Sequence, residues 1–499
     1  MYIMISRKNN LLIYIVLILT YSTVSYSQEI PKLSSKQMFE DYLYLKDFVI
    51  NNNPQIHVRK VIQGIDIVNI LNTYEDSISS CKNTKEFIFL INKLINLCND
   101  GHFSFAPYLA YNISHKTGKI NSKYDKFIWR NINESSLYGE KIFIDSSCFF
   151  LAGYGRIKKG KIDTVIAPGS EIYSINGITP LDYFNKSRFM RNDYKWDYYN
   201  KYFYHSTPRL NPNDAKRGVF FKIINHKNGK ISTHFYKKKL IPKGIIYGGW
   251  PKGFYTKRVL YIASNKVLYI RIPKMKNKSY YMSEIPRVAS KNQIDKVIID
   301  IRDNGGGSDS VWIEVLRYII KEPIKTNINY VIRNSADIIE SLGYTKDSLA
   351  EYTGNLFPCN EYRIIEDVEI ISPSTNSINY SGNIYILQDD KCYSAAGSLI
   401  AMSQYHDFII NIGQQTGTIL GRGVNPVIRV LPNSRYCFTM EPVIDITNCK
   451  ETIDLFHDSV EIPLKMNLDK WLDIFYNYDN FDSIFLIKYD PWMKKVLNY

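Results

Sequence analysis

The chain has 499 residues, of which 45% are hydrophobic and 22% are charged. This length predicts more than one domain, and the composition excludes an intrinsically disordered chain, which would contain fewer apolar residues. The formal net charge of +15 comes from Lys and Arg residues that are scattered along the chain. We therefore expect no nucleic-acid partner, because such a partner favours clustered basic residues.

The first residues have the pattern of a secretion signal. Arg7 and Lys8 precede the apolar run 11–20, and small residues follow up to Ser27. The run is shorter than the ~20 residues that a membrane-spanning helix needs. We therefore expect a signal peptide at 1–27 and an exported protein, periplasmic or extracellular, with no membrane span after cleavage.

Three regions of different character follow. Residues 28–125 carry apolar side chains at helical spacing and predict a helical domain, whose last helix runs into the loop that contains Asp100, Gly101 and His102. Residues 126–250 have short aromatic and β-branched runs between turn residues, as in a β-rich domain. From 251 to 499, strand-like and helix-like runs alternate, which predicts an α/β domain.

The cysteines do not indicate a metal site. The seven cysteines form no CxxC pair and no Cys/His cluster with zinc spacing. The sequence therefore predicts neither a metal nor another cofactor. An odd number with irregular spacing also predicts no particular disulfide pairing, although export would permit disulfides.

One motif joins a strand to a helix through glycines. Residues 296–308 form a buried-strand run that ends in Gly305, Gly306 and Gly307, and apolar residues at helical spacing follow. Backbone without Cβ can approach a ligand closely and present its N–H groups at the helix start. The pattern favours an oxyanion or anion site. The alternative is a tight turn, and the missing Gly-Lys-Ser/Thr ending argues against phosphate binding.

A second strand-to-helix unit places Ser394 at its turn. Residues 383–387 have strand character and 394–402 begin a helix. A serine in this position exposes its hydroxyl beside the free N–H groups of the first helical turn, as nucleophilic serines do. The alternative is a structural N-cap.

These units, with 411–417 after another strand, resemble the tail-specific (C-terminal-processing) serine peptidase family and its tricorn-like relatives. The motifs occur in the family's order over about 258–465, and 267–272 resembles the strand that opens its catalytic domain. The resemblance implies an α/β fold with a crotonase/Clp-like catalytic domain at 251–499, a helical N-terminal domain and a PDZ-like β-rich middle domain.

The resemblance also implies a reaction and its residues. Ser394 matches the nucleophile, and the N–H of Ala395 with that of Gly305 or Gly306 would form the oxyanion hole. Asp100-Gly101-His102 resembles the element that carries the histidine base of the tricorn-like branch. The implied activity is hydrolysis of peptide bonds through an acyl-enzyme on Ser394.

The other branch of the family uses a lysine base, and this chain has Arg422 in the corresponding position. Arginine does not give up its proton at neutral pH, so the lysine dyad is absent. A carboxylate should orient the histidine, and Glu441 and Glu451 both remain candidates. His457 lies near them in sequence and is expected at the surface.

Residues 168–177 resemble the PDZ-like signature Gly-x-x-Ile-x-x-Ile-Asn-Gly. The resemblance implies substrate binding by the residues of that signature, which are Gly169, Ile172, Ile175, Asn176 and Gly177. Such a module adds an extended peptide to a sheet edge or binds a free C-terminal carboxylate. The expected partners are therefore peptide or protein substrates.

Two departures from the family keep other functions open. Gly397 stands where many members have Glu, and residues 458–463 replace the usual Gly-Val-x-Pro-Asp element. The alternatives to a peptidase are a catalytically inactive peptide-binding protein and a binder of small apolar ligands.

Overall fold

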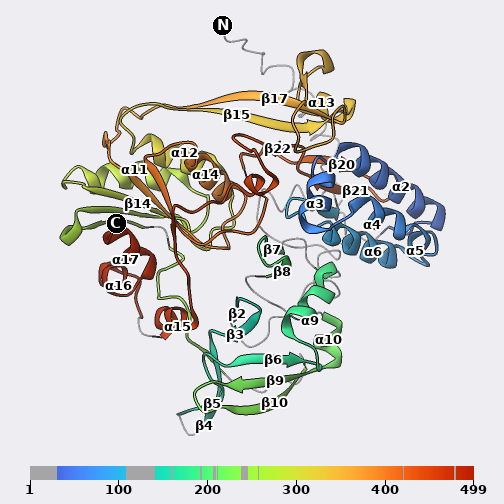
Figure 1. Ribbon diagram of the computed structural model, residues 1–499. Helices are drawn as coiled ribbons and strands as arrows, with labels where there is room; N and C mark the ends of the chain where they lie inside the picture. The colour runs from blue at the N-terminus through green and yellow to red at the C-terminus, as the bar shows by residue number, and fades with distance from the viewer. Residues whose placement is uncertain are drawn as a thin grey trace, which may run out of the picture.

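The computed structural model describes residues 31–107, 141–158, 161–190, 194–205, 210, 212–237, 245–256, 258–419, 421–476 and 479–499. The chain has a mixed α/β fold (Figure 1). The expected signal peptide, 1–27, lies outside the described residues. Within those ranges, no helix combines the length and the apolar character that crossing a membrane requires.

The N-terminal part is helical. Its helices are α2 (Ser35–Asn52), α3 (Gln55–Gln63), α4 (Ile67–Thr73), α5 (Glu75–Ser79) and α6 (Thr84–Leu97). Ser34 caps α2 in a capping box with Gln37, and Asn83 caps α6. After α6 the chain turns through Asn99, at φ 55°, toward the short strand β1 (Ser104–Pro107). The loop that contains His102 therefore lies between the last helix and a strand.

The middle part is rich in β-strands and lies at the bottom of Figure 1. One sheet has the order β10-β9-β6-β3-β2 and another has the order β11-β4-β5. The strands are β2 (Lys141–Ile144), β3 (Ser147–Phe150), β4 (Gly153–Lys158), β5 (Lys161–Ile166), β6 (Glu171–Ile175), β9 (Val219–Asn225), β10 (Lys230–Tyr236) and β11 (Ile245–Tyr247). Two helices, α9 (Pro180–Lys186) and α10 (Pro212–Arg217), and the hairpin of β7 (Lys195–Asp197) with β8 (Tyr202–Tyr204) complete it.

The third part is built on a sheet with the order β12-β13-β14-β18-β19-β23. Its strands are β12 (Arg258–Ile262), β13 (Val267–Arg271), β14 (Lys296–Asp300), β18 (Ile384–Gln388), β19 (Ile409–Gly413) and β23 (Ile462–Pro463). The strands from β13 to β23 are parallel, whereas β12 is antiparallel to β13. Parallel strands end at the same edge, so the loops after β14 and β18 meet there.

Helices cover both faces of this sheet. One face packs against α11 (Lys278–Ala289), α12 (Ser310–Arg317) and α14 (Ala395–Ser403). The other packs against α15 (Leu468–Tyr476), α16 (Ser483–Lys488) and α17 (Pro491–Leu497), which close the chain (Figure 1). Burial on both faces explains why these strands read as continuous apolar runs in the sequence.

Two smaller sheets connect this part to the rest of the molecule. A long hairpin of β15 (Ile324–Arg333) and β17 (Tyr362–Ile371) pairs with β16 (Ala350–Glu351) and β22 (Ile444–Asp445). The other sheet has the order β1-β21-β20, where β20 is Val427–Val430 and β21 is Tyr436–Met440. Its strand β1 comes from the helical part, so this sheet joins the N-terminal helices to the C-terminal half.

Candidate active site

Ser394 ends the turn between β18 and α14. Its backbone has φ 55° and ψ −128°, and its side chain makes no capping hydrogen bond to the helix. A non-glycine residue held at positive φ costs roughly 1–3 kcal/mol, and such strain occurs at sites that aim a functional side chain. The N-cap alternative therefore does not describe this hydroxyl.

His102 meets Ser394 across the interface between the helical and α/β parts. The imidazole Nε2 lies 3.2 Å from the Ser394 Oγ. The backbone N–H of His102 donates to Asp100 Oδ1 at 3.0 Å, and its carbonyl accepts from Thr439 Oγ1 at 2.6 Å. The ring of Tyr393 packs beside it, with centroids 5.1 Å apart. The structure thus brings together two residues separated by 292 positions.

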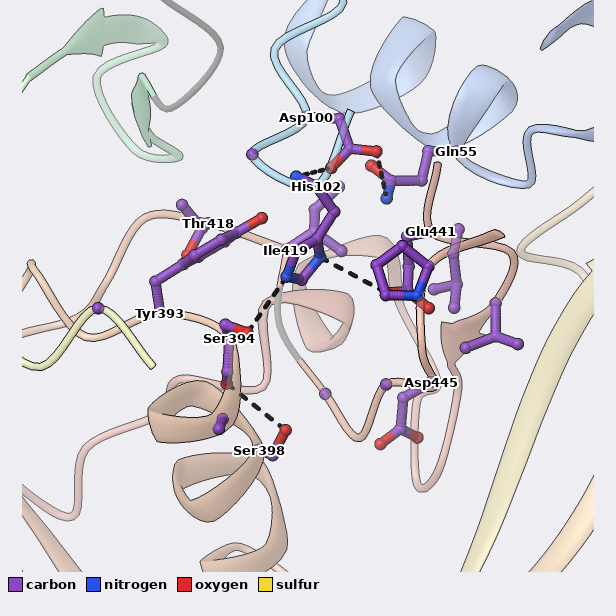
Figure 2. Close-up of a pocket in the computed structure, with 18 of the residues that line it drawn as sticks. Gln55, Asp100, His102, Tyr393, Ser394, Ser398, Thr418, Ile419, Glu441 and Asp445 are labelled. Carbon is purple, nitrogen blue, oxygen red and sulfur yellow. Dashed lines mark hydrogen bonds and ion pairs between the residues drawn. The ribbon is translucent and has the colours of Figure 1, made fainter. Parts of the chain in front are cut away.

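Glu441 lies on the other side of the imidazole, as Figure 2 shows. Its Oε2 is 3.4 Å from His102 Nδ1. Burial raises the pKa of Glu441 well above its ordinary value, and the nearby charge of Asp100 raises it further. The other candidate carboxylate, Glu451, instead caps the 3-10 helix Thr452–Phe456. Glu451 does not contact the histidine, so only Glu441 has the position of an orienting group.

The glycine loop after β14 passes directly over Ser394. A Cβ added to Gly306, whose φ is 101°, would lie 2.6 Å from the Ser394 Cβ and 3.1 Å from the Ala395 nitrogen. No side chain fits at this position. A Cβ at Gly305 would meet no atom within 4 Å, so that residue borders open space.

One of the expected oxyanion donors is already engaged. The N–H of Gly306 donates to Asn304 Oδ1 at 2.8 Å in this structure, which favours Gly305 among the two glycines expected to supply a donor. In the part of the chain that the structure describes, the N–H groups of Gly305 and Ala395 donate to no acceptor. These two groups are the remaining pair from the sequence-based expectation.

Two further residues, not identified from the sequence, hold the loops together. Asn304 is buried; its Nδ2 donates to Ile272 O at 2.8 Å, and its carbonyl accepts from the Tyr393 N–H at 3.1 Å. Asp389 is also buried, and its Oδ1 accepts from the N–H of Asp303 at 2.9 Å and of Lys391 at 3.1 Å. Each residue connects the glycine loop to the turn of the nucleophile. The sequence indicated such a role only through the residue types, because Asn and Asp in tight turns commonly bond to nearby backbone groups.

The pKa of Asp389 reflects this position. Burial, followed by the charges of Asp390 and Asp303, raises the pKa of Asp389 to about 6, while Lys391 opposes the shift. The carboxyl therefore titrates within the range where enzymes are commonly assayed.

Two cationic groups near the site, Arg422 and Lys391, are held by carboxylates. Arg422, in the position of the family's lysine, contacts Glu369 Oε1 at 2.7 Å and Asp309 Oδ1 at 3.3 Å. Lys391 Nζ lies 3.1 Å from Asp303 Oδ1. These contacts explain why neither side chain is placed to take a proton from Ser394.

His457 is not a surface residue. It is 4% exposed, and its Nε2 donates to the Asp445 carbonyl at 3.0 Å. The expectation of a surface position is therefore wrong, because the 3-10 helix before it folds the imidazole inward. His457 does not line the cavity that contains Ser394.

Ser394 and His102 open into a cavity of about 1060 Å³ (Figure 2). Its walls come from the helical part, the hairpin of β7 and β8, the glycine loop and residues 418–419 and 421–426. Most lining side chains are polar or charged. No group of three or more His, Cys, Asp or Glu within the described ranges is arranged to hold a metal ion.

The PDZ-like residues lie elsewhere, and none of the five lines this cavity. Ile172 and Ile175 are 1% and 0% exposed and pack in the core, because β6 lies inside its sheet between β3 and β9. This burial corrects the expectation that these two side chains contact a substrate. Asn176 accepts from the Phe220 N–H at 2.9 Å, and Gly177, at φ 84°, continues that turn. Gly169 faces Leu472 of α15.

Comparisons with known proteins give a family match and similar folds. The model of a family described as Peptidase family S41 matches residues 266–448. The crystal structure of mature CPAF is similar, with 12% identity and a TM-score of 0.57, over 93% of this chain and 98% of that chain. Mature CPAF complexed with lactacystin gives 13% identity, a TM-score of 0.55 and coverage of 93% and 98%. At this identity the likeness shows a shared fold. No curated protein sequence matches.

Proposed function

We propose that this chain, whose residues 266–448 match the model of peptidase family S41, is an exported serine-type peptidase that cleaves peptide bonds through an acyl-enzyme on Ser394. In this proposal, His102 is the general base and Glu441 orients it. The substrates are peptides or proteins.

One observation carries the proposal: the distance of 3.2 Å between Ser394 Oγ and His102 Nε2. This is the reach that a base needs to take a proton from a nucleophile. The hydroxyl is not used in helix capping. An inactive protein would not need a serine held at positive φ beside an imidazole from another part of the chain.

The first half of the reaction forms the acyl-enzyme. Ser394 Oγ attacks the carbonyl carbon of the scissile bond, and its proton passes to His102 Nε2. The oxygen of the tetrahedral intermediate accepts hydrogen bonds from the N–H groups of Gly305 and Ala395. Losing one such donor costs roughly 10²–10³ in rate. His102 then gives the proton to the departing amine, and the C–N bond breaks.

The second half releases the product. Water loses a proton to His102 and attacks the ester carbon, and Ser394 recovers its proton as the ester breaks. Glu441 lies 3.4 Å from Nδ1 and faces the positive charge that the imidazole acquires in each half. Because burial raises the pKa of Glu441, its negative charge is best stabilised when His102 is protonated.

The architecture fits this role. We infer a crotonase/Clp-like catalytic domain from the sheet with helices on both faces, and a PDZ-like module from the β-rich middle part. Lys195 of β7 lines the cavity that contains Ser394, and the backbone N–H of the next residue, Trp196, donates to the Gly417 carbonyl at 2.8 Å. Export through the segment 1–27, with a periplasmic or extracellular location, remains part of the proposal.

A fluorophosphonate probe tests the activity directly, because it reacts with activated serines. We expect the mature protein to be labelled, and mass spectrometry to place the label on Ser394. Ser394→Ala should abolish labelling. Ser398→Ala is the matched control, since Ser398 lines the same cavity one turn further along α14, and it should still be labelled. Absence of labelling in folded protein would leave a binding role instead.

A further inference from the structure

Helix α3 presents a polar face to the catalytic cavity. Gln55, Arg59 and Gln63 follow each other at intervals of one helical turn and line the same wall. Arg59 is only 5% exposed. A buried guanidinium is costly unless it is paired with a negative charge, so its partners need to be identified.

The partners of Arg59 are neutral. Its Nε donates to Gln55 Oε1 at 2.7 Å, and its Nη1 donates to Gln63 Oε1 at 2.9 Å. Among the residues that the structure describes, no carboxylate lies within 4.0 Å of Arg59, and its Nη2 donates to no acceptor. Two amide oxygens thus fix the direction of the guanidinium without cancelling its charge.

The nearest negative charge is already committed to other groups. Asp100 accepts from the His102 N–H at 3.0 Å with Oδ1 and from Gln55 Nε2 at 3.3 Å with Oδ2. Burial lowers the pKa of Arg59 even though Asp100 acts in the opposite direction. The environment therefore leaves the charge of Arg59 incompletely balanced.

Two other cations of the cavity show the contrast. Lys391 is paired with Asp303 at 3.1 Å, and Arg422 is paired with Glu369 at 2.7 Å and with Asp309 at 3.3 Å. Those charges are compensated within the protein. Arg59 also lines this cavity, but among the described residues it has no carboxylate partner.

We propose that Arg59 binds a carboxylate of the substrate and makes the enzyme selective for peptides that carry one at this position. The free N–H groups of a guanidinium match the two oxygens of a carboxylate, which gives both affinity and orientation. The carboxylate comes either from the C-terminus of the peptide or from an acidic side chain. This inference rests on the proposed peptidase function.

Hydrogen bonds connect Arg59 to the loop of His102. Gln55 contacts both Arg59 and Asp100, and Asp100 holds the loop of His102. A carboxylate bound at Arg59 therefore lies along the wall that carries the histidine, and it fixes part of the substrate relative to the reacting groups. Fixing a substrate in this way accelerates its reaction by positioning.

The experiment measures how peptides protect Ser394 from fluorophosphonate labelling. The probes are tetra-alanine with a free C-terminus, its C-terminal amide, and amidated tetra-alanine with one Ala replaced in turn by Glu or by Gln. In the wild-type protein, a peptide with the carboxylate should protect at a concentration at least about 10-fold lower than its neutral counterpart. The free acid against its amide tests the C-terminus, and Glu against Gln tests the side chain.

Two variants test the role of the unbalanced charge on Arg59. Arg59→Gln deletes it, whereas Gln63→Glu keeps the guanidinium and supplies an internal carboxylate. Both should reduce the preference for the carboxylate to less than about 2-fold. Gln63→Glu keeps the test valid if Arg59→Gln fails to fold.

The outcomes separate this inference from the proposed function. If the wild-type protein is not labelled at all, the proposed function fails. If it is labelled but free acids and Glu peptides protect no better than neutral ones, the carboxylate site is refuted. The inference is also wrong if Arg59→Gln slows labelling equally with all peptides and leaves the preference unchanged, because Arg59 would then only support the loop of His102.

Discussion

His102 Nδ1 lies 3.4 Å from Glu441 Oε2, while the opposite nitrogen of the same ring lies 3.2 Å from Ser394 Oγ. The imidazole therefore stands between a buried carboxyl group and a hydroxyl. Glu441 follows β21 directly, and His102 lies two positions before the first residue of β1. Because these two strands pair, the positions of both residues are set by a single sheet.

Replacing Glu441 by Gln tests this relationship. The amide has nearly the same shape but cannot carry the charge that stabilises the imidazolium or selects its tautomer. We expect the rate of fluorophosphonate labelling to fall at least about 10²-fold, with little change in the thermal midpoint. Glu451→Gln is the control and should label like the wild type, because Glu451 caps a distant 3-10 helix. Equal rates for both variants would remove Glu441 from the mechanism.

Glu441 should also affect the pH profile. Because burial raises its pKa, the carboxyl gains a proton as the pH falls through that raised value and then no longer supports a protonated His102. Labelling of the wild type should therefore decline on acidification through this range. The step contributed by Glu441 should be missing from the Glu441→Gln profile, measured at constant ionic strength.

His102→Ala tests the identity of the base. Without the imidazole, the Ser394 proton has no acceptor at hydrogen-bond distance, and labelling should fall at least about 10²-fold. Lys450→Ala is the comparison for a lysine base, since Lys450 is exposed and should not affect labelling. Near-normal labelling of His102→Ala together with a dead Lys450→Ala would overturn the assignment.

The glycine loop offers a matched pair of substitutions. Ala at Gly306 would place its Cβ 2.7 Å from the Tyr393 carbonyl and requires φ 101°, so the loop must shift away from Ser394. We expect Gly306→Ala to lose at least about 10² in labelling rate, as when an oxyanion donor is lost. Gly305→Ala meets no atom within 4 Å and keeps its N–H, so it should retain most of the activity. Similar rates for the two would contradict this close approach.

Asp389→Asn should change how stability depends on pH. The folded pKa of Asp389 is raised from 3.8 to about 6 by burial and by Asp390 and Asp303. The folded protein thus keeps this proton up to a higher pH than the unfolded chain does. The contribution of Asp389 to the free energy of unfolding is therefore largest below pH 3.8 and is lost as the pH rises to about 6. The Tm of Asp389→Asn minus that of the wild type should increase between about pH 4 and pH 7. A constant difference would show that Asp389 does not titrate there.

The position of Ser394 in a strand-to-helix turn could be predicted from sequence because its cause is local. A strand, a turn and a helix lie within a few residues of Ser394, and β18 and α14 have those positions. The same holds for the glycine loop. Side-chain pairing across the molecule is different: Ser104 and Thr439 contact each other although they are 335 positions apart, and no local pattern selects that register. The sequence therefore leaves Glu441 and Glu451 as equal candidates for the carboxylate that orients His102. The pairing of β1 with β21 brings only Glu441 to the histidine.

For two sets of expected site residues, the structure shows contacts within the protein that the sequence also indicated. Asn304 precedes Gly306 by two residues, and an Asn side chain commonly accepts from the N–H two positions on, which is the bond observed. Ile172 and Ile175 are apolar residues of a strand inside a sheet, and such residues normally pack in the core. In both cases the family resemblance suggested a ligand contact, whereas local chemistry indicated a structural one.

The pairing of β1 with β21 makes catalysis depend on the completeness of the chain. A chain interrupted before residue 436 would contain Ser394 and the glycine loop, but it would lack Glu441 and the strand that fixes the His102 loop. In the proposed mechanism, peptide hydrolysis therefore begins only after segments 335 positions apart have joined. Local opening of this one ladder would likewise switch the enzyme off while the parallel sheet stays folded, so loss of activity on heating should precede loss of the main core.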